Sequence, residues 1–124
     1  MKKVIATKGA PAAVGPYSQA ILAGDTLYVS GQIPVNPADG TISTTIEEQT
    51  AQCLANIDAI LAEAGYTKDD VVKTTVLLDN MDNFVAMNGV YAGYFTTDMP
   101  ARACYQVAKL PLGVMVEIES IAVK

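Results

Sequence analysis

The hydrophobic and polar positions of this chain alternate in short runs that are typical of strands, separated by two longer stretches with helical spacing. Residues rich in β-branched and apolar side chains predict strands at 18–23, 26–30, 70–78, 102–107 and 114–123. Gly24 and Asp25 separate the first two runs and indicate a tight hairpin turn.

The first helical stretch begins after a threonine cap and ends near Gly65. Two capping-box patterns fit its start, Thr44 with Glu47 or Thr45 with Glu48. A second helix is expected after a cap at Asp79 or Asn80. Its apolar face would carry Phe84, Met87, Asn88, Tyr91, Tyr94 and Phe95.

The order of these elements predicts an α+β fold in a single domain that spans residues 1–124, with a mixed sheet of about six strands. Two helices suffice to cover one face of such a sheet. The run 114–123 is apolar on both faces, so we expect the uncovered face to pack against other copies of the chain. The short connection 109–113 suggests a hairpin that brings Glu117 or Glu119 within reach of Arg102.

Composition narrows the possible chemistry. The chain has no histidine, which removes the usual catalytic base near neutral pH and the common zinc sites. Its two cysteines have no CxxC spacing, and we expect neither a metal nor a cofactor. The net charge of −5, without a basic cluster, disfavours nucleic acid as a partner.

We expect a cytoplasmic protein without membrane association. The opening residues do not resemble an export signal. No apolar run has the roughly 18 residues that a membrane span requires.

Arg102 is the only arginine, and it lies between two alanines in a predicted strand. The planar fork of a guanidinium matches a carboxylate through two parallel hydrogen bonds. A small organic carboxylate is one partner that fits this setting, and a structural ion pair with one of the 13 acidic residues is the other.

Further candidates surround this arginine. Cys104 points the same way as Arg102 in a strand and is either part of a site wall or a small buried hydrophobe. No histidine is present to activate its thiol, which argues against covalent catalysis. Weaker signals are Tyr17, Ser30, Gly31 and Asn88.

Several segments together resemble the RidA family, also called YjgF. They are 10–20 (AxxAVGPYSQA), 28–37 (YVSGQIPVNP), 71–78 (VVKTTVLL), 99–111 (MPARACYQVAKLP) and 116–123 (VEIESIAV). The resemblance implies a chorismate-mutase-like homotrimer with ligand clefts between subunits. It also implies hydrolysis of 2-iminobutanoate and 2-iminopropanoate to 2-oxo acids and ammonia.

The same resemblance implies roles for individual residues. Arg102 is the marker of the deaminase branch, Glu117 handles the attacking water, and Cys104 lines the pocket through its backbone. The matching cleft positions are Tyr17, Ser30, Gly31 and Asn88. Two other classes stay open: a non-catalytic binder or sensor of small 2-oxo acids, and a chaperone-like oligomer. A ribonuclease that inhibits translation is disfavoured by the acidic charge and the missing histidine.

Overall fold

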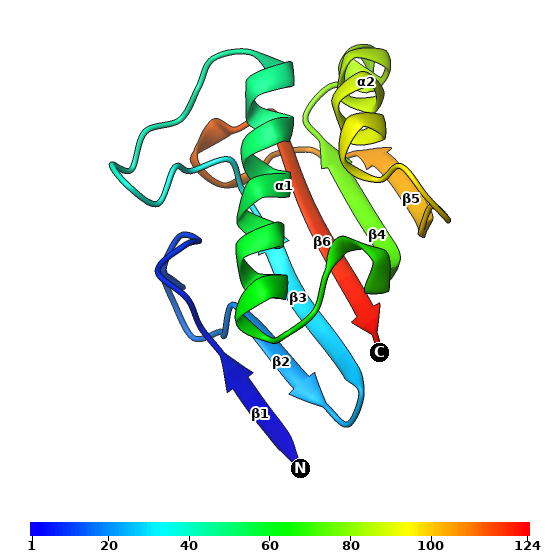
Figure 1. The fold of residues 1–124 in the computed structure, drawn as a ribbon. Coiled ribbons are helices and arrows are strands. Elements are labelled where there is room, and N and C mark those ends of the chain that lie inside the picture. The colour runs from blue at the N-terminus through cyan, green and yellow to red at the C-terminus, as the bar shows by residue number, and fades with distance from the viewer.

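In the computed structural model, which describes residues 1–124, two helices lie across one face of a six-stranded sheet (Figure 1). The strands are β1 (Lys2–Ile5), β2 (Ala20–Ala23), β3 (Thr26–Gln32), β4 (Val71–Leu78), β5 (Ala101–Gln106) and β6 (Val116–Val123). The helices are α1 (Ile46–Glu63) and α2 (Phe84–Tyr94). The α+β class and the arrangement of helices on one face are confirmed.

The strand order across the sheet is β1-β2-β3-β6-β4-β5. All neighbours are antiparallel except β4 and β5, which are parallel and are joined through α2. The sheet is therefore mixed, as predicted. The chain contains no helix that is both long and apolar enough to cross a membrane.

The start of α1 follows the second of the two capping patterns. The Thr45 hydroxyl accepts a hydrogen bond from the Glu48 backbone N–H at 3.2 Å, and it donates to the Glu48 carboxylate at 2.9 Å. The chain leaves the helix at Gly65, whose φ of +79° is easily adopted only by glycine. Both ends of this helix are thus specified by local sequence.

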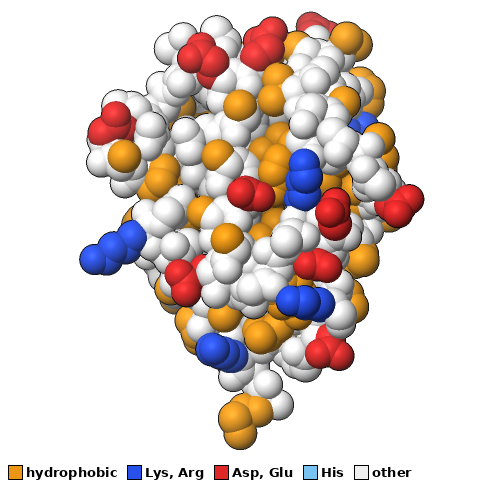
Figure 2. Space-filling model, in the orientation of Figure 1, with side chains coloured by type: hydrophobic (Ala, Val, Ile, Leu, Met, Phe, Trp, Pro, Cys, Tyr) orange, Lys and Arg blue, Asp and Glu red, His pale blue; other side chains and the backbone are white.

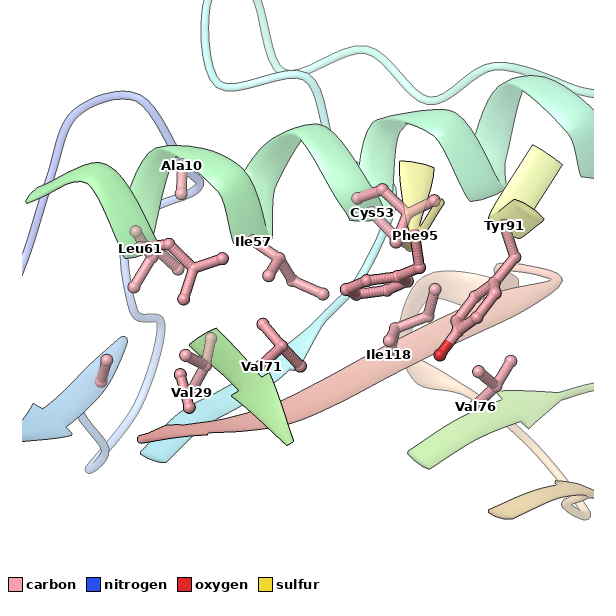
Figure 3. Packing of buried hydrophobic residues seen from close by; sticks show 14 of the residues in the cluster. Ala10, Val29, Cys53, Ile57, Leu61, Val71, Val76, Tyr91, Phe95 and Ile118 are labelled. Atoms are coloured by element: carbon pink, nitrogen blue, oxygen red, sulfur yellow. The ribbon is translucent and has the colours of Figure 1, made fainter. Parts of the chain in front are cut away.

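The core lies between the two helices and the sheet (Figure 3). It is a single cluster of 21 buried residues, in which Leu61 of α1 lies over Val29 of β3 and Ile57 of α1 lies over Val71 of β4. Alternate residues of β6 point away from this core. Glu117 and Glu119 therefore lie together on the face that the helices leave open.

The predicted hairpin between β5 and β6 is wrong. β6 pairs with β3 on one side and with β4 on the other, so β4 separates it from β5. The short turn Pro111–Gly113 carries the chain past β4 instead of folding it back onto β5. The reason lies in the apolar residues on both faces of β6, which suit a central strand, whereas the more exposed β5 forms an edge.

The open face of the sheet carries apolar side chains, as the sequence predicted. Tyr28, Tyr105 and Val123 are 50%, 52% and 42% exposed there. Leu77 of β4 is the register partner of Tyr105, and Ile121 of β6 is the register partner of Tyr28. That other copies cover this face remains a prediction.

The strand β1 has no counterpart in the sequence prediction. Its pattern holds only two apolar residues after Lys2 and Lys3, and it forms an edge by pairing with β2. Lysines on an edge strand discourage further strand addition.

Candidate functional site

Arg102 lies on the edge strand β5, on the side of the sheet that carries the helices. Its Nη1 donates a hydrogen bond of 2.7 Å to Oδ1 of Asn88 on α2. Its Cζ lies 4.8 Å from the ring centroid of Tyr91 and 5.6 Å from that of Phe84. No carboxylate oxygen lies within 4.0 Å of the guanidinium nitrogens, so Arg102 forms no ion pair within the chain.

These partners leave most of the guanidinium available. An arginine has five N–H donors, and one of them is used by Asn88. The aromatic rings attract the cation through their faces and take none of the donors. The remaining fork is able to take a carboxylate in two-point contact.

Cys104 points to the same side as Arg102, as predicted. Arg102 pairs with buried Thr74 and Cys104 with buried Val76, so both side chains lie on the helix side of β5. Burial raises the pKa of the Cys104 thiol, and the nearby Arg102 only partly opposes this. A protonated thiol is a poor nucleophile, which fits a role in the wall of the site. Cys53 is fully buried in the core, as predicted.

A second group of polar residues gathers around Glu117 on the open face of the sheet. The pairing of β3 with β6 is irregular between Val29 and Gln32, and this irregularity presents Ser30 and Gly31 to the carboxylate. A Cβ at position 31 would overlap the Glu117 carboxylate, whose Cδ would lie only 2.9 Å away. A side chain at position 31 would therefore displace the Glu117 carboxylate, which glycine allows to rest on the backbone.

Glu117 is half-buried, and no cation lies within ion-pair distance of it. Burial raises the pKa of its carboxyl, and the negative charge of Glu119 raises it further. The pKa of Glu117 is thus shifted toward neutral pH, where a group that accepts and donates a proton works best.

The Glu117 side chain opens into a cavity of about 820 Å³ that also includes Tyr17, Ser30 and Gly31. Apolar side chains form much of the remaining wall, among them Val14, Ile33, Val35 and Leu112. Four of the residues suggested by the sequence are therefore brought together. Arg102, Asn88 and Cys104 do not line this cavity.

The candidate site residues of one chain form two separate halves. The arginine half, Arg102 with Asn88 and Cys104, lies on the helix side at the β5 edge. The glutamate half, Glu117 with Tyr17, Ser30 and Gly31, lies on the open side, and β4 runs between the two strands that carry the charges. The expectation that a glutamate of β6 reaches Arg102 of the same chain is wrong, because the hairpin on which it depended does not form.

Sequence reasoning missed Gln19, which shapes the glutamate half. This side chain is 4% exposed; its Oε1 accepts from the Thr7 N–H at 2.7 Å, and its Nε2 donates to the Pro11 carbonyl at 2.8 Å. The Ser30 hydroxyl donates to the Ser18 carbonyl at 2.6 Å. Together these bonds tie the segment 7–18, which carries Tyr17, onto the sheet. The sequence signal that could have identified Gln19 was its position directly before the apolar strand β2.

Sequence reasoning also placed Tyr91 only on the apolar face of α2, not at the site. It lies three positions after Asn88, so the two side chains share one side of the helix and both reach Arg102. This spacing was the signal that could have identified it. No group of three or more His, Cys, Asp or Glu side chains is placed to hold a metal ion.

The chain matches known proteins over its whole length. A family model described as Endoribonuclease L-PSP matches residues 7–124. A 2-iminobutanoate/2-iminopropanoate deaminase of Capra hircus is 50% identical over 100% of this chain and 91% of that protein. A solved Rid-family protein, YyfA of Yersinia pestis, is 52% identical with a TM-score of 0.97, and each chain is covered to 100%.

A solved structure of TdcF from E. coli with bound serine is also similar. It is 41% identical, with a TM-score of 0.96, and 98% of each chain is covered. The motifs around Arg102 and Glu117, the shared fold and these full-length matches agree with one another. The chain belongs to the L-PSP family, the family of the RidA and YjgF proteins.

Proposed function

We propose that this protein hydrolyses small 2-imino acids, of which 2-iminobutanoate and 2-iminopropanoate are the first candidates, to 2-oxo acids and ammonia. The observation that carries the proposal is the guanidinium of Arg102, which is held by an amide oxygen and two aromatic rings and paired with no acid. A carboxylate of the substrate completes its hydrogen bonding. The deaminase name of the goat relative and the serine bound to TdcF point to the same ligand class.

Glu117 supplies the second requirement of the reaction, which is a proton relay. Its carboxylate accepts a proton from water as the water oxygen bonds to the imine carbon. The proton then passes to the nitrogen and gives a carbinolamine. The carboxylate next takes the proton of the carbinolamine hydroxyl and passes it to the amino group, so the C=O bond of the 2-oxo acid forms as the C–N bond breaks and ammonia leaves. The raised pKa of Glu117 suits both steps, because the group must accept and return one proton near neutral pH.

A complete site requires the two halves to come from different subunits. Within one chain they lie on opposite faces of the sheet. We infer that a second copy packed on the open face brings its own Arg102 edge toward the cavity of the first. The exposed apolar residues of that face support such packing. We therefore propose a homotrimer in which each interface contains one site, with Cys104 forming wall beside Arg102.

Two alternatives fit the structure less well. A non-catalytic binder of 2-oxo acids needs Arg102, but it has no use for a half-buried glutamate seated against Gly31. RNA cleavage suits neither the absence of histidine nor the net charge of −5. Figure 2 shows acidic and basic side chains interspersed on the helix-covered face, without a basic stripe.

A coupled assay tests the proposed activity. Threonine dehydratase with threonine generates 2-iminobutanoate, and semicarbazide traps the imine that survives. Adding this protein should lower the rate of semicarbazone formation in proportion to its concentration, while an Arg102→Lys variant should lower it much less. A trapping rate that stays unchanged at every concentration of the wild-type protein would contradict the proposal.

A further inference from the structure

We propose that Tyr91 is a positioning residue: the face of its ring fixes the plane of the Arg102 guanidinium so that the fork meets the substrate carboxylate. This inference rests on the proposed function and assigns a role to a side chain outside the cavity. It also explains why the only arginine of the chain is held by aromatic and amide groups.

Tyr91 is held rigidly by its surroundings. The side chain is 6% exposed, and its hydroxyl shares a hydrogen bond of 2.7 Å with Oγ1 of fully buried Thr74. The ring of Phe95 packs against it with centroids 4.8 Å apart, and Figure 3 shows the Tyr91 hydroxyl pointing down toward the sheet near Val76 and Ile118. The ring is therefore a fixed surface.

The same strand pair places the ring and the guanidinium. Thr74 of β4, which anchors the Tyr91 hydroxyl, is also the register partner of Arg102 in β5. The Arg102 Cζ lies 4.8 Å from the ring centroid, closer than to Phe84 at 5.6 Å. A long and flexible side chain at a sheet edge is thus given one preferred orientation.

An aromatic face does this without competing with the substrate. A carboxylate partner would occupy the fork and cancel the charge, whereas a ring attracts the cation through its quadrupole and leaves the N–H groups free. Burial raises the pKa of the Tyr91 phenol, so it stays neutral and adds no negative charge beside Arg102.

The chain offers a matched control in Tyr66. This tyrosine is also buried, at 7% exposure, and its hydroxyl donates to the Asp25 carbonyl at 2.7 Å. A cation, Nζ of Lys124, lies 5.6 Å from its ring centroid. Tyr66 is outside both halves of the site, so the same substitutions there measure the general cost of losing a buried ring.

The experiment compares Tyr91→Phe, Tyr91→Leu, Tyr66→Phe and Tyr66→Leu in the full-length protein. The dissociation constant of 2-oxobutanoate is measured by titration calorimetry, and KM and kcat are measured with 2-iminobutanoate. Tyr91→Leu should raise both the dissociation constant and KM by about five- to thirtyfold, with kcat changed less than about threefold. Tyr91→Phe and both Tyr66 variants should stay within about threefold of the wild type.

Two results would overturn the assignment. Equal dissociation constants for Tyr91→Leu and Tyr66→Leu would show that the ring does not act on Arg102. Equal losses in Tyr91→Phe and Tyr91→Leu would assign the effect to the hydroxyl bond with Thr74. If Tyr91→Leu fails to fold, Tyr91→Met fills more of the space and carries the same expectation. A wild-type protein that neither binds 2-oxobutanoate nor hydrolyses the imine overturns the proposed function as well.

Discussion

The arginine half and the glutamate half hold opposite charges by opposite means. Arg102 is surrounded by neutral groups that orient it, namely the Asn88 oxygen and the rings of Tyr91 and Phe84. Glu117 rests on the backbone at Gly31 beside another acid, Glu119, and its pKa is raised. Each half thus keeps its charge free of an internal partner. The comparison indicates that each charged side chain is available to interact with a ligand or with a group of the other half.

The largest expected effect is in the glutamate half. Glu117→Gln keeps the shape of the side chain but removes the base, so kcat should fall by about 10²–10⁴ with little change in the affinity for 2-oxobutanoate. Cys104→Ala is the matched control and should stay within about tenfold of the wild-type rate, since its thiol has a raised pKa. The reverse ranking in steady-state kinetics would point to covalent catalysis.

The same Glu117→Gln variant should be more stable than the wild type at neutral pH. A carboxyl with a raised pKa binds more protons in the folded state than in the unfolded state, so its contribution to stability falls as the pH rises through that window. The thermal midpoint of the variant should therefore exceed that of the wild type at pH 7, and the difference should shrink toward pH 4. A difference that grows as the pH falls would contradict the raised pKa.

In the arginine half, Arg102→Lys keeps the charge but loses the planar fork. Losing charge-assisted hydrogen bonds of about 1.5–3 kcal/mol should lower kcat/KM by roughly ten- to a hundredfold or more. Circular dichroism should show an unchanged fold. Hydrolysis of 2-iminobutanoate at wild-type efficiency would rule out clamping of the carboxylate by Arg102.

Asn88→Asp tests whether the neutrality of the arginine half matters. The substitution keeps the oxygen that accepts from Arg102 at 2.7 Å, but it adds a negative charge that occupies the guanidinium. The dissociation constant of 2-oxobutanoate should rise by about tenfold, and added salt should reduce the penalty. Binding as tight as in the wild type would mean that the neutral partners have no functional purpose.

The smallest expected effect concerns the loop that carries Tyr17. Gln19→Glu removes the N–H groups that donate to the Pro11 carbonyl, so we expect a loosened loop and a KM raised by about two- to tenfold. Gln49→Glu is the control, because Gln49 is equally buried at 4% exposure and donates to the Ser43 carbonyl instead. If both variants change KM equally, Gln19 has no particular link to the site.

Local features of this fold were readable from the sequence, and features that depend on strand order were not. The Thr45 cap and Gly65 set the ends of α1, and alternation placed Arg102 and Cys104 on one side of β5. β6 lies between β3 and β4 because of long-range strand pairing. A short sequence pattern does not specify which strands will pair. Because the strand order was not predicted, the separation of Arg102 from Glu117 was not predicted either.

The residues of the site divide in the same way. Family motifs identified the groups that we propose to face the ligand, whereas Gln19 and Tyr91 contact other parts of the chain. Gln19 bonds to a segment that begins twelve positions earlier at Thr7, and Tyr91 to a strand residue seventeen positions earlier at Thr74. Such contacts become visible only when the chain is folded.

The central claim, that each site takes Arg102 from one subunit and Glu117 from another, is tested most directly by mixing subunits. Arg102→Lys and Glu117→Gln chains are produced separately, unfolded together in equal amounts and refolded. Random assembly places a wild-type arginine opposite a wild-type glutamate at about one site in four, so about a quarter of the wild-type activity should return. Arg102→Lys mixed with Asn88→Asp, both in the arginine half, should gain nothing beyond the average of the two separate proteins. If the activity of the Arg102→Lys and Glu117→Gln mixture stays at the average of those two separate proteins, the claim is contradicted and both groups of each site lie in one chain.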